Sequence, residues 1–218
     1  ARQASAAVPW EAAYTVQLAA NHPLANGAAT ALRLTVARER PGPKGSCGSL
    51  LVRIDAPLAL KGAGLVTHAG KAWLRMPGGK AELATAARLF KPVPGLDIPW
   101  VAFAPFEVAG LHSATVEGEF GDVAVLRGKP DYVAGPGVTP VKAGISKRFG
   151  AWVVGEVTDR HGKTTALVQW LELGELQGAV IPERLRLRGS GAEATAVDLR
   201  RQTLTSGRAR AWGPRLLR

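Results

Sequence analysis

Few residues of this chain have the type and spacing that chemistry requires. Gly162-Lys163-Thr164 has the sequence that ends a phosphate-binding loop, but the glycine required five residues before Gly162 is replaced by Val157. These residues also fall in an expected hairpin turn rather than at the start of a helix, so the cradle of backbone amides is missing. We therefore expect a turn here and no nucleotide site.

The histidines and the cysteine form no catalytic or metal-binding pattern. The four histidines lie far apart, and none is three or four residues from another. With the single cysteine, Cys47, no metal-ligand spacing emerges and no disulfide within the chain is possible. A set of Ser113, His112 and Asp122 lacks the sequence of a nucleophile elbow. We expect no enzyme activity, no catalytic residue, no metal and no cofactor.

The elements that must position any functional side chain are short strands. Apolar and polar residues alternate over segments separated by Gly, Pro, Asn or Asp, as in antiparallel strands with one apolar face. Roughly ten such strands, with turn signals every ~8–12 residues, are typical of a sandwich or barrel. We expect strands at residues 14–18, 32–36, 50–54, 64–68, 71–76, 80–88, 121–126, 152–157, 165–170, 184–188 and 194–199, with a helix as the alternative for 81–89.

Aromatic residues are concentrated in a proline-bounded stretch, residues 99–106. Trp100, Phe103, Phe106 and Leu111 have loosely helical spacing, which favours one or two helical turns laid across the apolar face of the sheet. The six tryptophans either fill the core or line a cavity, and both interpretations stay open, because an aromatic side chain supplies a large apolar wall in either place.

The alternation also predicts which side chains share the inner face of the sheet. Residues two apart on a strand point to the same side, so each strand contributes a short apolar row. With Trp100, Phe103, Phe106 and Leu111 as a lid, the predicted lining of an apolar cavity is Leu32, Leu34, Val36, Leu50, Val52, Ile54, Leu74, Met76, Val153, Val157, Val168, Trp170, Leu185 and Leu187.

Length and charge limit the classes of protein that remain. The 218 residues suit one domain, 1–218, with a basic C-terminal tail at about 205–218. No apolar run approaches the ~18 residues of a membrane-spanning helix. The net charge of +11 favours anionic partners, although most arginines are scattered along the chain. The start at Ala1-Arg2-Gln3, without methionine, suits a secreted form trimmed of its signal peptide.

Three short motifs carry a resemblance to a known family. Arg53-Ile-Asp-Ala-Pro57, Leu60-Lys-Gly62 and Lys71-Ala-Trp-Leu-Arg-Met-Pro77 resemble segments of the outer-membrane lipoprotein-sorting (LolA/LolB-like) proteins. The order of the later strands is also similar, over about residues 12–204. The resemblance implies a strongly curved antiparallel sheet, an incomplete β-barrel, with short helices as a lid over an apolar cavity.

The same resemblance implies a periplasmic, non-catalytic carrier. Its cargo would be the acyl chains of lipids or lipoproteins, taken from a membrane-associated donor and passed to an acceptor at the outer membrane. The positive charge would help it dock on anionic head groups. Two alternatives stay open: an envelope scaffold without cargo, and a basic nucleic-acid-binding β domain, for which Arg184-Leu-Arg-Leu-Arg188 is the main support. We expect no nucleic-acid partner.

Overall fold

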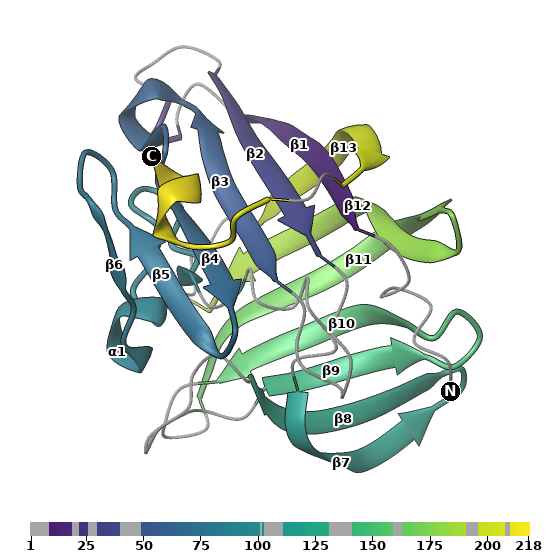
Figure 1. The fold of residues 1–218 in the computed structure, drawn as a ribbon. Coiled ribbons are helices and arrows are strands. Elements are labelled where there is room, and N and C mark those ends of the chain that lie inside the picture. Colours follow the sequence, from purple (N-terminus) through teal and green to yellow (C-terminus); the bar gives the residue numbers. More distant parts are fainter. Residues whose placement is uncertain are drawn as a thin grey trace.

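The chain folds into one antiparallel sheet of thirteen strands (Figure 1). The computed structural model describes residues 9–18, 22–25, 30–39, 49–100, 102, 111–130, 141–158, 163–190, 196–207 and 210–218. The strands are β1 (Trp10–Leu18), β2 (Thr30–Arg38), β3 (Leu50–Ala56), β4 (Gly64–His68), β5 (Lys71–Arg75), β6 (Ala81–Leu83), β7 (Leu111–Phe120), β8 (Val123–Pro130), β9 (Val141–Ser146), β10 (Ala151–Thr158), β11 (Thr164–Leu176), β12 (Ala179–Gly189) and β13 (Val197–Ser206). The helical elements are α1 (Ala86–Leu89) and two 3-10 turns, η2 (Leu58–Leu60) and η5 (Pro214–Leu217).

The sheet consists of two meanders joined side by side. Strands β1 to β6 follow one another in space as in sequence, and so do β7 to β13, while β1 pairs with β13 to join the two halves. The end strands of this order are β6 and β7, so the sheet curves strongly without closing (Figure 1). The predicted fold, a mainly β, incomplete barrel, is confirmed.

Alternation along the strands explains why the sheet has an apolar concave face. In β2, Leu32, Leu34 and Val36 are buried on one side, and the residues between them lie on the other. On that outer side, Thr35 donates a hydrogen bond of 2.5 Å to Asp55, which lies on β3. Burial of apolar side chains on one face and pairing of polar ones on the other together determine the register of β2 against β3.

A smaller apolar cluster lies on the convex, outer face. Leu217, in η5, is buried against Ala37, Leu51 and Val66, with Trp212 packed beside them. The C-terminal segment therefore crosses the outer face of the sheet, as the yellow trace shows in front of β3 and β4 (Figure 1). Residues 205 and 206 complete β13, and residues 210–218 form this crossing segment. The prediction of a single domain, 1–218, stays a prediction.

Some predicted elements differ from the structure. The strand expected over 80–88 is divided into β6 and α1, because the apolar spacing of 81–89 suits a helical turn as well as a strand. Strands β7 and β9 were not predicted. Leu111 begins β7 rather than belonging to a helical lid. Polar and glycine residues interrupt the alternation of β7, and its register shifts near Ser113 and Glu117 hide the period from the sequence.

Candidate functional site

The candidate site is the concave face of the sheet, where most of the predicted lining residues meet. They come from both meanders and form one buried cluster, joined by the partly buried Met76. Trp100 lies within the same cluster and is fully buried. The members of this cluster among the predicted residues are Leu32, Leu34, Val36, Leu50, Val52, Ile54, Leu74, Trp100, Val157, Val168, Trp170, Leu185 and Leu187.

Protein fills a large part of this concave face. The segment of residues 86–100, here called the plug, contributes Leu89, Val93, Ile98 and Trp100 to the cluster. The plug is a folded loop: the Val93 amide donates to the Ile98 carbonyl at 2.8 Å, and the Trp100 amide donates to the Lys91 carbonyl at 3.2 Å. Most of the predicted lining residues are therefore core residues in contact with protein, rather than the walls of an empty cavity.

A glycine on the sheet allows the plug to sit close to it. A Cβ atom built on Gly189, at the end of β12, would lie 2.1 Å from the carbonyl oxygen of Asp97 in the plug. No side chain fits at that distance, so the contact requires glycine. The sequence shows Gly189-Ser-Gly191 as a turn, and the close approach of a distant segment becomes visible only in the structure.

The concave face changes character toward β7. Cross-strand pairing aligns Val116 with Leu126 and Leu126 with Ala143, a residue of the main cluster, so the three side chains lie on the same face. Ala143 is buried and Leu126 is half-buried, while Val116 on the end strand is 64% exposed. Ala124 and Ile145 form a parallel row, both half-buried.

We call Val116, Ala124, Leu126 and Ile145 the open strip. These residues lie where the apolar concave face reaches the end strand of the sheet, and Val116 is the most exposed of them. Strand β7 itself is exposed from Ser113 to Glu117, and because neighbouring strand residues point to opposite faces, both of its faces are uncovered there. The open strip therefore continues the buried cluster outward to an uncovered end of the sheet.

Several predicted site residues lie elsewhere. Phe103 and Phe106 fall outside the described residues. Leu111 is the first residue of β7, as reported above. Val153 is half-buried and lies at a shift of register between β9 and β10, outside the main cluster, because the extra residue of a bulge turns its side chain away from the regular alternation.

The open strip was missed because each of its strands is a weak signal. The pattern of residues 121–126 predicts a strand, but no residue of it was among the predicted lining residues. The residues of β9 give no strand signal. All residues from Val123 to Leu126 are apolar, so no alternation distinguishes inner from outer residues there. Pairing with Ala143, which only the tertiary structure shows, identifies the inner ones.

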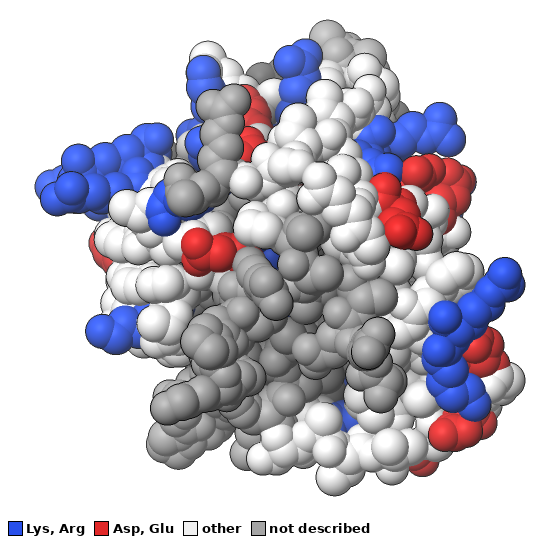
Figure 2. Space-filling view, turned by 45° about the vertical axis from the view of Figure 1, so that its right-hand side comes forward, with Lys and Arg blue, Asp and Glu red and all other residues white. Residues whose placement is uncertain are grey.

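On the outer face several basic residues are paired with carboxylates. Asp198 on β13 accepts two hydrogen bonds from Arg186, at 2.6 and 2.8 Å, and one from Arg184 at 2.9 Å. The hydrogen bonds from Arg186 lower the pKa of the Asp198 carboxyl to about 2, and Arg184 adds to this effect. Figure 2 shows basic side chains in separate groups, several of them next to acidic ones.

Metal-ligating side chains are scattered in the part of the chain that the structure describes. Among them, no group of three or more His, Cys, Asp or Glu side chains could hold a metal ion. Within the same part of the chain, no helix combines the length and hydropathy needed to cross a bilayer. The concave cluster consists of hydrocarbon and aromatic side chains, which bind apolar groups by excluding water.

Solved structures show the same fold at low sequence identity. A domain from Vibrio parahaemolyticus described as an outer membrane lipoprotein-sorting protein matches with a TM-score of 0.65 at 15% identity, over 91% of this chain and 85% of that one. A DUF1329 family protein from Desulfovibrio piger matches with a TM-score of 0.68 at 12% identity, over 94% and 88% of the two chains.

A third similar structure is a LolA superfamily protein from Nitrosomonas europaea, with a TM-score of 0.64 at 13% identity, over 94% of this chain and 88% of that one. No protein-family model matches the chain, and no curated protein matches it in sequence. The sheet thus has the fold of the lipoprotein-sorting proteins that its sequence motifs resemble.

Proposed function

We propose that this protein is a non-catalytic carrier that binds an acyl chain of a lipid or lipoprotein against the open strip. The observation that carries the proposal is the exposed apolar end of an otherwise filled concave face, at Val116 and Leu126. Each CH₂ group that such a surface takes from water contributes ~0.8 kcal/mol, so one chain binds without specific polar contacts. The fold shared with lipoprotein-sorting structures supports the same proposal.

In this proposal the carrier works in the periplasm, between a membrane-associated donor and an acceptor at the outer membrane. The acyl chain lies along β7, β8 and β9, next to the plug that fills the rest of the concave face. Because the contact is hydrophobic and non-directional, the cargo is released when a partner or membrane offers a comparable apolar surface.

Nucleic-acid binding is the less favoured alternative. It would need strand arginines that are free to meet phosphates, yet Arg184 and Arg186 are held by Asp198. An envelope scaffold that keeps the fold but carries nothing is the other alternative, and only a binding measurement separates it from a carrier.

The test is to express the protein with export to the periplasm, purify it without detergent, and analyse extracted lipids by mass spectrometry. Binding of a fluorescent fatty acid is then compared for Val116→Asp and Thr115→Asp. Both residues are exposed on β7, but register places Thr115 with Arg127 on the outer face. We expect Val116→Asp to weaken binding at least about tenfold, since it puts a charge against the chain, and Thr115→Asp to leave it near wild type.

Two outcomes would contradict the proposal. If no lipid is recovered and the wild-type protein does not bind the fatty acid, the scaffold alternative is favoured. If Val116→Asp and Thr115→Asp weaken binding equally, the cargo does not lie on the open strip.

A further inference from the structure

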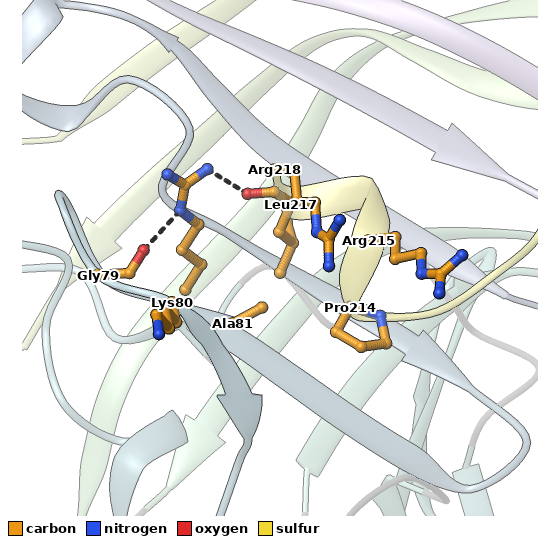
Figure 3. Close-up of a pocket in the computed structure, with 8 residues that line it drawn as sticks. Gly79, Lys80, Ala81, Pro214, Arg215, Leu217 and Arg218 are labelled. Atoms are coloured by element: carbon orange, nitrogen blue, oxygen red, sulfur yellow. Dashed lines mark hydrogen bonds between the residues drawn. The ribbon is translucent and has the colours of Figure 1, made fainter.

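The outer face of the sheet carries a groove that lies on the opposite side from the open strip. It lies between the β5–β6 hairpin and the C-terminal 3-10 turn and has a volume of about 630 Å³ (Figure 3). Trp73 and Ala81 pack with the outer cluster. Ala72 and Leu74, on either side of Trp73 in β5, pack on the concave side. The residues that line it, here called the basic groove, are Arg75, Gly79, Lys80, Ala81, Pro214, Arg215, Leu217 and Arg218.

The polar side chains that line the basic groove are all cationic. Arg75, Lys80, Arg215 and Arg218 line it, and no Asp or Glu does. Among the described residues, Lys80, Arg215 and Arg218 form no ion pair, whereas many cations elsewhere are neutralised, such as Arg127 by Glu117. A positive potential is therefore concentrated here and left for an external anion.

Two backbone carbonyls hold in place the guanidinium of Arg75, which lines the groove. Its Nε donates to the Gly79 carbonyl at 2.9 Å, and its Nη1 donates to the Leu217 carbonyl, as the dashed lines show (Figure 3). It also lies against Gly62, where a Cβ would come within 2.9 Å of Nη1. Since a guanidinium has five N–H donors, donors remain for an oxyanion in a fixed orientation.

An exposed leucine lies beside the groove on the same face. In the pairing of β5 with β6, Leu83 lies opposite Trp73 and Ala81 lies opposite Arg75. The side chains of Ala81 and Leu83 therefore point outward. Leu83 is 60% exposed on the end strand of the sheet. A large apolar side chain next to unpaired cations matches a bilayer surface, where hydrocarbon lies just below anionic phosphates.

We propose that this surface docks the protein on a bilayer that contains anionic phospholipid. Arg75, Lys80 and Arg215 meet the phosphate groups, and Leu83 enters the interfacial layer. This docking surface goes beyond the proposed carrier function. The docking surface lies on the opposite face from the open strip. Vesicle binding is therefore expected whether or not the protein carries an acyl chain.

The experiment measures co-sedimentation of the full chain with phosphatidylcholine vesicles, with and without phosphatidylglycerol, at low and high salt. We expect binding only when phosphatidylglycerol is present, weakening as salt rises. The double variant Lys80→Gln/Arg215→Gln should bind about 25-fold more weakly, about fivefold for each lost cation. Leu83→Ser should lower the binding that remains at high salt.

The matched control is Arg188→Gln/Arg200→Gln, which removes the same charge from exposed positions on β12 and β13. Circular dichroism checks that all variants are folded. Equal weakening in both double variants would overturn the site, because it would show a general effect of net charge. Vesicle binding that inorganic phosphate abolishes at constant ionic strength would indicate a site for the free anion, and stronger binding to polyglutamate than to vesicles would indicate an acidic protein partner; either would overturn the bilayer proposal.

Discussion

At the scale of single residues, ion pairs on the convex face stabilise the sheet and neutralise much of its charge. Asp198 of β13 takes part in two of these ion pairs, since its carboxylate accepts hydrogen bonds from Arg184 and Arg186 of β12. Hydrogen bonds from Arg186 and then Arg184 lower the pKa of the Asp198 carboxyl from 3.8 to about 2. The folded protein therefore stabilises the charged carboxylate more than the unfolded chain does.

We expect Asp198→Asn to lower the free energy of unfolding by about 1 kcal/mol at neutral pH, below the full value of the pKa shift because the carboxylate is partly exposed. A depressed carboxyl pKa stabilises the fold above the unfolded value of 3.8, and this contribution is lost as the pH falls toward 2. Urea unfolding at several pH values should therefore show the variant and wild type converging in acid.

The control for that prediction is Glu175→Gln, which removes a carboxylate from an exposed position with no ion pair among the described residues. It should change stability little at any pH. A difference between Asp198→Asn and wild type that persists unchanged at pH 2 would contradict the assignment to the ion pairs.

At the scale of elements, the plug decides how much of the concave face is core. It brings Val93, Ile98 and Trp100 against strands of both meanders, and its backbone approaches Gly189 closely. The plug therefore acts as a folded insert that covers a large part of the face, while Val116 at the β7 end stays exposed.

Gly189→Ala should force the plug away from β12 and lower the free energy of unfolding by about 1–3 kcal/mol, as in overpacked cores. The matched change is Gly118→Ala on β7, where the nearest atom to a Cβ is 3.6 Å away in the Phe120 ring. Thermal unfolding compares the loss of stability in Gly189→Ala with that in Gly118→Ala. An equal loss in both would show a general cost of removing a strand glycine rather than a clash with the plug.

At the scale of the whole molecule, the two faces of one sheet are covered by different segments. The plug lies on the concave side, and the C-terminal segment lies on the convex side with Leu217 fully buried. Pairing of β1 with β13 brings residues 10–15 beside residues 200–206, so both ends of the chain join the two meanders into one sheet.

Leu217→Ala should therefore lower the free energy of unfolding of the whole sheet, by about 2–3 kcal/mol, because it leaves a cavity between η5 and the outer face. Leu83→Ala, at an exposed leucine of the same face, should stay within about 0.5 kcal/mol of wild type. Chemical denaturation followed by tryptophan fluorescence checks both. An unchanged midpoint for Leu217→Ala would mean that the C-terminal segment does not stabilise the sheet.

Local alternation predicted antiparallel strands and the apolar rows on β2, β3, β11 and β12, and the family resemblance added the strong curvature of the sheet. Residues of such a row are two apart, so the period of two places them on one face, although it does not show that Leu51 is buried on the other face of β3. The motifs around Asp55, Lys61 and Trp73 added the resemblance to the lipoprotein-sorting fold, which the solved structures bear out.

Only the tertiary structure decided which part of that face is filled and which is open. Whether Leu34 lines a hollow or packs in one cluster with Trp100 depends on where a segment more than fifty residues away comes to lie, and a local pattern contains no information on that distance. The same holds for Val116, whose inner orientation follows from pairing across bulges, and for the basic groove, which two segments far apart in sequence form together. Alternation is a property of neighbouring residues, whereas a surface open to a ligand is a property of what the rest of the chain leaves uncovered.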